Sequence, residues 1–136
     1  MNDCFTTPIE VRFRDLDAMG HVNNAVYLTY LESARTDFFK SLLLIEKVKE
    51  MAFILAKVDI DFKIPITFSD HPEVLLWVKS IGTTSWWFEY KIIESENAER
   101  IYAIAKSVQV VYNYDKGEKE NIPRNFKEIL ESHTIK

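Results

Sequence analysis

Two carboxylates, a glycine, a histidine and two asparagines fall within ten positions near the N-terminus. The segment reads Asp15-Leu16-Asp17-Ala18-Met19-Gly20-His21-Val22-Asn23-Asn24. An amphipathic helical pattern follows it at once. The first N–H groups of a helix have no intrahelical partner, and with the helix dipole they can stabilise an oxyanion. A carboxylate facing such donors could attack a thioester carbonyl, or activate a water that does. The segment therefore predicts hydrolysis by acyl transfer.

Asp17 is the carboxylate to which we assign this chemistry, because it is nearer than Asp15 to Gly20 and to the helix start. From position alone, a surface or capping aspartate would be the more common interpretation. Gly20 lets the chain turn sharply, and the helix start supplies donors, so both features favour the catalytic role. Asp15 is expected to be a hydrogen-bonded loop residue.

His21 follows Asp17 by four positions and has two interpretations. It either fixes the turn, or it orients Asp17 or hydrogen-bonds the substrate carbonyl. Asn23 or Asn24 is predicted to cap the helix. The three histidines, at positions 21, 71 and 133, are too scattered to indicate a metal site. No metal and no cofactor are expected.

A helix over residues 24–45 must position these groups. Its apolar stripe recurs at helical spacing and comprises Tyr27, Leu31, Ala34, Phe38, Leu42 and Ile45. Glu32 and Arg35 lie one turn apart on this helix, and we interpret them mainly as a structural pair.

Alternating apolar residues predict a first strand over 7–14, and four further strands follow the helix. These are 52–63, 73–81, 86–94 and 100–113, with a short helix at 124–131. Short turns between strands imply antiparallel pairing. The order β-α-β-β-β-β predicts an α+β fold with an antiparallel five-stranded sheet and one long helix.

Two surfaces of this sheet carry further predictions. In 52–63 the even-numbered residues are all apolar, which predicts one face buried throughout, while the other face turns charged toward its end. Aromatic residues on later strands suggest apolar surface on both faces of the sheet, and these are Trp77, Trp86, Trp87 and Phe88. A homo-oligomer would cover such surface.

The composition indicates a single domain spanning residues 1–136. A net charge of −4 argues against nucleic-acid or anionic-membrane binding as a general property, although a local basic patch could hold a phosphate. Cys4 is the single cysteine, so no intrachain disulfide is possible. No secretory leader or membrane span is evident. These features predict a soluble, cytoplasmic protein.

The motif Asp-x-Asp-x-x-Gly-His-Val-Asn-Asn-x-x-Tyr-Leu, followed by Leu-Glu-Ser-Ala-Arg, resembles hotdog-fold acyl-CoA thioesterases of the 4-hydroxybenzoyl-CoA thioesterase type. The resemblance extends over nearly the whole chain. It implies a sheet wrapped around the central helix, and a dimer or dimer of dimers with sheets joined edge to edge. The family's catalytic carboxylate falls on Asp17, and its oxyanion donors fall on backbone N–H groups near Asn24.

In the family arrangement the active sites lie at the dimer interface. The polar end of strand 52–63 would then line the neighbouring subunit's site, where Lys57 and Lys63 could meet the phosphates of CoA. A solvated strand end is the alternative interpretation. Asn23 and Tyr27, beside the catalytic segment, complete the expected substrate-binding residues.

The resemblance implies an acyl-CoA substrate and leaves three other functions open. Plant acyl-ACP thioesterases share the His-Val-Asn-Asn segment, but they carry an asparagine where this chain has Met19. Hotdog enoyl-CoA hydratases or dehydratases place Asp and His five apart, whereas Asp17 and His21 are four apart. A non-catalytic acyl-binding protein is the third alternative. Thiol release from acyl thioesters separates these cases.

Overall fold

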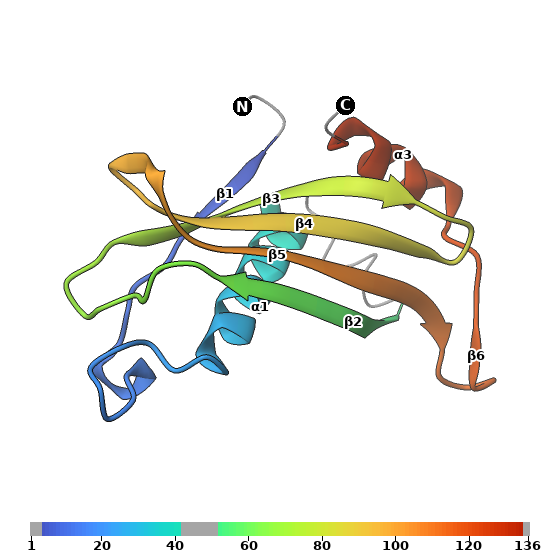
Figure 1. Cartoon of the computed structure of the whole chain (residues 1–136). Helices are drawn as coiled ribbons and strands as arrows, with labels where there is room; N and C mark the ends of the chain where they lie inside the picture. Colours follow the sequence, from blue (N-terminus) through green and yellow to red (C-terminus); the bar gives the residue numbers. More distant parts are fainter. Residues whose placement is uncertain (1–3, 42–51, 135–136) are drawn as a thin grey trace.

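The computed structural model describes residues 4–41 and 52–134. Its elements are β1 (Phe5–Pro8), the 3-10 helix η1 (Phe13–Asp15), α1 (Val26–Ser41), β2 (Phe53–Phe62), β3 (Pro72–Ile81), β4 (Ser85–Glu94), β5 (Asn97–Asn113), β6 (Glu118–Lys119) and α3 (Arg124–Ser132). The main sheet has the order β1-β3-β4-β5-β2, and its neighbours are antiparallel. Helix α1 crosses one face of this sheet (Figure 1). The predicted α+β architecture is confirmed.

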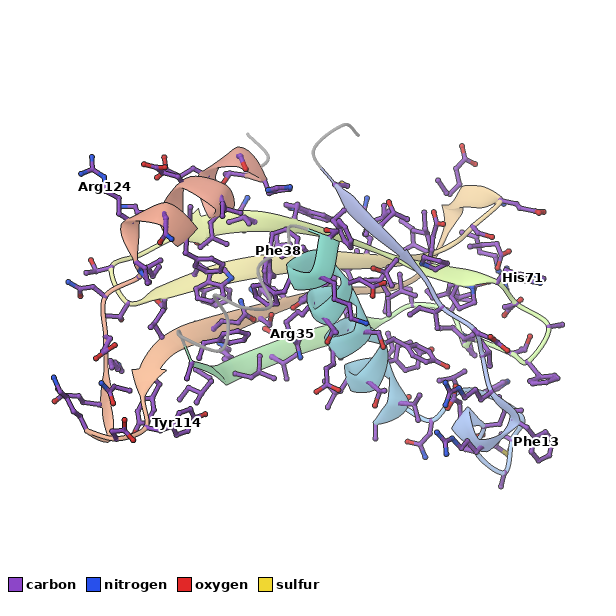
Figure 2. All side chains as sticks on the ribbon, turned by 180° about the vertical axis from the view of Figure 1, so that it is seen from behind. Phe13, Arg35, Phe38, His71, Tyr114 and Arg124 are labelled. Carbon is purple, nitrogen blue, oxygen red and sulfur yellow. The ribbon has the colours of Figure 1, made fainter. Side chains whose placement is uncertain are left out.

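Helix α1 buries the face that the sequence pattern predicts. Its buried residues are Tyr27, Tyr30, Leu31, Ala34, Phe38 and Phe39. Phe38 projects from α1 toward the sheet (Figure 2) and meets Phe88 of β4 with ring centroids 5.3 Å apart. Positions 42–45 of the predicted helix lie outside the described residues. The buried face of α1 packs on the sheet through aromatic contacts such as that between Phe38 and Phe88, as its periodicity indicates.

The prediction of a first strand over 7–14 is wrong in its bounds. The strand ends at Pro8, which has no backbone N–H to continue a ladder. The chain then turns into η1, where the Asp15 carboxylate accepts the N–H of Arg12 at 2.9 Å. A side chain that captures a nearby backbone group in this way competes with strand pairing.

The prediction of one continuously buried face on β2 is also wrong. The pairing register between β2 and β5 shifts between Leu55 and Lys57, which marks a β-bulge. A bulge moves the following side chains to the opposite face. Phe53, and not Ile54, therefore packs against the core, while Phe62 at the far end is 47% exposed.

The two faces of the sheet differ in character. Trp86 is fully buried, with its ring 5.1 Å from that of Phe126, whereas the next residue, Trp87, lies on the opposite face with the ammonium group of Lys106 5.7 Å from its ring. Trp77 is on the same outer face and donates from its indole N–H to Glu89 at 3.0 Å. The outer face thus mixes indole rings with charges, and its tryptophans do not form a purely apolar surface.

The C-terminal helix α3 matches the predicted 124–131 segment and packs on β3, with Phe126 and Leu130 buried. The two-residue strand β6 was not predicted, because so short an element leaves no periodic pattern. None of the helices in the described ranges is long and apolar enough to cross a membrane.

Candidate active site

The loop between η1 and α1 folds back on itself. Leu16 and Val22 form an antiparallel bridge, and inside it the N–H of Asp17 donates to the carbonyl of His21 at 2.7 Å. Gly20 turns the chain with a φ of 79°, a conformation that a residue with a Cβ rarely adopts. The turn therefore places Asp17 and His21 opposite each other, as their four-residue spacing requires.

The two oxygens of the Asp17 carboxylate have different surroundings. Oδ1 accepts the N–H of Met19 at 2.8 Å and the N–H of His21 at 3.2 Å. Oδ2 accepts no hydrogen bond from any residue in the described ranges. One oxygen thus holds the turn, while the other is available to a substrate or a water.

The start of α1 leaves fewer free donors than the sequence suggests. The Asn23 side chain accepts the N–H of Ala25 at 2.9 Å, and the Asn23 carbonyl accepts that of Val26 at 2.9 Å. The N–H of Tyr27 donates to the Asn24 carbonyl at 3.3 Å. These bonds explain why the regular helix begins at Val26 and not at residue 24. Within the part of the chain that the structure describes, the N–H of Asn24 has no acceptor.

The segment after β2 closes over this loop. His21 pairs with Thr67 in an isolated antiparallel bridge, and the N–H of Val22 donates to the carbonyl of Ile66 at 2.8 Å. Asp70 fixes the closing segment, because its carboxylate accepts the N–H of Thr67 at 2.8 Å. The end of β2 is thereby held against the start of α1.

A pocket of about 250 Å³ lies between these segments. It is lined by Asp17, His21, Val22, Asn24, Tyr27, Phe62, Lys63, Ile64 and Pro65. Five of the seven predicted site residues therefore come together. Lys63 lines the pocket of its own chain, whereas the family resemblance implies a place at the neighbouring subunit's site. The phenol of Tyr27 is largely desolvated, and this burial raises its pKa, so it stays protonated at neutral pH.

The other two predicted residues lie outside the pocket lining. Asn23 faces the helix start, where its side chain accepts the N–H of Ala25. Lys57 lies on the outer face of the sheet, with its ammonium group 5.9 Å from the ring of Trp87. Sequence reasoning missed Phe62, Ile64 and Pro65, which reach the site only through the pairing of residues far apart in the chain.

The family model of the thioesterase-like superfamily matches residues 11–130. The chain belongs to this superfamily. Acyl-CoA thioester hydrolase YbgC of Escherichia coli O6:H1 is 31% identical over 99 residues, which cover 68% of this chain and 72% of the relative. The chain is thus a thioester hydrolase with the hotdog fold.

Solved structures agree over nearly the full length. A predicted thioesterase from Bacillus stearothermophilus superposes with a TM-score of 0.87 at 26% identity, covering 98% of both chains. A Thermus thermophilus thioesterase complexed with coenzyme A and zinc gives a TM-score of 0.82 at 30% identity, over 96% of this chain and 94% of that one. In the described residues here, no group of three or more His, Cys, Asp or Glu side chains could hold a metal ion.

Asp15 stabilises the loop between η1 and α1 through three hydrogen bonds. Its carboxylate Oδ2 accepts the Tyr30 hydroxyl at 2.8 Å as well as the N–H of Arg12, and its carbonyl accepts the N–H of Asn23. Burial, reinforced by the bond to Asp15, raises the pKa of Tyr30 well above its usual value. The expectation that Asp15 is hydrogen-bonded is confirmed, although Asp15 is the last residue of η1 and not a loop residue. Tyr30 is the partner that the sequence did not reveal.

Tyr30→Phe is expected to lower the free energy of unfolding by about 1–2 kcal/mol, because it leaves a part-buried carboxylate short of one donor. Urea unfolding measures this change. Tyr112→Phe is the matched control, since the Tyr112 ring contacts that of Tyr114 while its hydroxyl makes no hydrogen bond to any of the described residues. Equal losses in the two variants would argue against a clamp between Asp15 and Tyr30.

Proposed function

We propose that the chain hydrolyses acyl-CoA thioesters to a free acid and CoA thiol, with Asp17 as the reacting carboxylate. One observation carries the proposal: a carboxylate oxygen and a backbone N–H, both without protein partners in the described ranges, belong to residues of one pocket. The N–H is that of Asn24, at the positive end of α1. It is the proposed donor to the oxyanion.

Two routes use these groups, and both end in acid and thiol. As a general base, Asp17 takes a proton from water while the water oxygen attacks the thioester carbonyl. As a nucleophile, Asp17 forms a mixed anhydride, expels the thiolate and is regenerated by water. In either route negative charge develops on the carbonyl oxygen, where one donor such as the Asn24 N–H contributes about 10²- to 10³-fold in kcat. The expelled thiolate takes up the proton that was removed from water.

Acyl-CoA is the proposed substrate class. The E. coli relative is named an acyl-CoA thioester hydrolase, and the T. thermophilus neighbour was solved with coenzyme A. Lys63, in the lining of the pocket, is the cation that we propose for the CoA phosphates. His21, whose backbone is fixed by Asp17 and Thr67, orients the carboxylate.

The deciding experiment measures thiol release from short, long and aromatic acyl-CoAs. We expect release from at least one class, reduced by about 10²- to 10⁴-fold in kcat with Asp17→Asn. Turnover of acyl-carrier-protein thioesters alone would identify the other thioesterase class. A change in enoyl-CoA absorbance without thiol would indicate a hydratase, and tight binding without turnover would indicate an acyl-binding protein.

We also propose that two copies join through β2. This strand is an edge of the sheet, and an edge presents unpaired N–H and C=O groups. Large apolar side chains are exposed along the seam between β2 and α1, namely Leu28 (43%), Leu55 (45%) and Phe62 (47%). Pairing of two β2 edges would cover both features.

Leu55→Lys is therefore expected to raise the dimer dissociation constant by at least about tenfold, because each buried leucine contributes about 1.5–3 kcal/mol. Sedimentation or light scattering across a dilution series measures the change. Ile104→Lys is the matched control, since Ile104 is 39% exposed on the inner strand β5. A wild-type monomer, or equal dissociation by both variants, would remove β2 as the interface.

A further inference from the structure

A chain of hydrogen bonds runs from helix α1 into the middle of the sheet. The Arg35 guanidinium donates to the Tyr90 hydroxyl at 3.1 Å. The single Ser107 proton goes to Oε1 of Gln109, so the Tyr90 hydroxyl must donate to Ser107. Gln109 closes the chain by donating to the Trp86 carbonyl at 3.4 Å. Every link thus points the same way, starting at Arg35.

This series of hydrogen bonds lies in a core that is otherwise mostly apolar. Tyr90, Ser107 and Gln109 are each 0% exposed. Buried polar groups stabilise a fold poorly, but when fully satisfied they fix one geometry. Burial raises the pKa of the Tyr90 hydroxyl, so it stays protonated at neutral pH and the chain persists there. The series of hydrogen bonds therefore fixes the position of the Arg35 guanidinium.

Arg35 does not pair with Glu32, contrary to the expectation from their spacing. Among the described residues no ion pair joins them within 4.0 Å, and Arg35 reaches into the sheet instead (Figure 2). Arginine carries five N–H donors. Only the bond to Tyr90 uses one of them in the described structure, which leaves the others without an acceptor.

Arg35 and Glu32 line a groove of about 160 Å³ between α1 and β2. The rest of its lining is Leu28, Thr29, Leu55 and Val58. The catalytic pocket lies on the same seam, nearer the helix start, with Asn24 and Tyr27 from α1 and Phe62 from the end of β2. Asn24 and Arg35 are eleven positions apart, which is roughly 16 Å along a helix. An acyl group that leaves the catalytic pocket along this seam would reach the groove.

We propose that Arg35 recognises an uncharged oxygen, a hydroxyl or an oxo group, on the distal part of the acyl group. The inference rests on the proposed function and names the substrates within it. A plain alkyl end would bury the remaining guanidinium donors without acceptors. The Glu32 carboxylate in the same groove disfavours an acyl group that ends in a carboxylate, and it can accept from a hydroxyl. Arg35 is thus a specificity-determining residue.

The test compares kcat/KM for saturated acyl-CoAs from hexanoyl to dodecanoyl with their ω-hydroxy counterparts. We expect the wild type to prefer the hydroxylated partner by about 10- to 100-fold at one or two chain lengths. Arg35→Met should bring this ratio close to one. Tyr90→Phe, which keeps the guanidinium but removes its anchor, should lower the ratio partway. Lys40→Met, which removes an exposed cation at the end of the same helix, should preserve it.

The ratio of the two kcat/KM values separates recognition from a loss of folded protein, because such a loss lowers kcat/KM for both substrates equally. A wild-type ratio near one at every length, or a ratio unchanged by Arg35→Met, would overturn the assignment of Arg35 while leaving hydrolysis established. Absence of thiol release from every substrate would overturn the proposed function and this inference together. If Arg35→Met fails to fold, Arg35→Gln and Tyr90→Phe carry the same comparison.

Discussion

Asp17→Asn is expected to lower kcat by about 10²- to 10⁴-fold, the range that a positioned acid or base supplies. The change is well suited to isolate chemistry from geometry. The amide oxygen of asparagine can still accept the N–H groups of Met19 and His21, so the turn keeps its shape. What disappears is the charge and the free carboxylate oxygen. Steady-state thiol release with the best acyl-CoA measures the loss.

Asp15→Asn is the matched control, because it neutralises a second carboxylate in the same loop while preserving an acceptor for Tyr30 and Arg12. Its kcat should stay within about tenfold of wild type. Near wild-type turnover by Asp17→Asn, or a larger loss from Asp15→Asn, would reverse the assignment. Unfolding curves for both variants show whether the loop has kept its stability.

The same site can distinguish a nucleophile from a general base. Hydrolysis of a mixed anhydride by attack at the Asp17 carbonyl would place solvent oxygen in that carboxylate. A single turnover in ¹⁸O-labelled water, followed by mass analysis of the peptide that contains Asp17, measures this directly. Label in Asp17 would therefore establish the anhydride route. Label in the product acid alone results from a general base and also from attack of water at the acyl carbonyl of the anhydride, so it would exclude only attack at the Asp17 carbonyl.

The loop that holds Asp17 and His21 was predictable because its parts are close in sequence. A glycine between Asp17 and His21 and a helix start at Asn23-Asn24 constrain the segment through local geometry alone. The strands from Pro72 onward were predictable for a similar reason, since their apolar runs end at clear turns. Local rules therefore predicted the core of the fold and the turn that places Asp17 beside the start of α1.

What the sequence could not show depends on register between distant segments. The bulge near Leu55 changes which β2 side chains face the core, and no periodic pattern in the sequence predicts it. Arg35 illustrates the same limit. Along the helix its nearest charge is Glu32, yet its actual partner, Tyr90, is 55 positions away. Residues whose partners come from the sheet are the ones that local patterns misplace.

Phe38→Ala is expected to lower the free energy of unfolding by about 3–5 kcal/mol, a large part of the total for a domain of this kind. Phe38 is 0% exposed and its ring meets those of Phe5, Phe88 and His133 at 5.8, 5.3 and 5.1 Å. Truncation leaves a cavity where α1 rests on the sheet. Urea or thermal unfolding measures the loss.

Phe13→Ala is the matched control, because Phe13 is 79% exposed at the tip of η1 (Figure 2) and should change stability by less than about 0.5 kcal/mol. Equal losses in the two variants would contradict the packing described for α1. Phe38 and Asn24 are fourteen positions apart, roughly 21 Å along a helix. Phe38→Ala should therefore keep most of its kcat at low temperature, where it remains folded, since the hydrogen bonds of Asn23 and Asp17 hold the catalytic end of α1 independently.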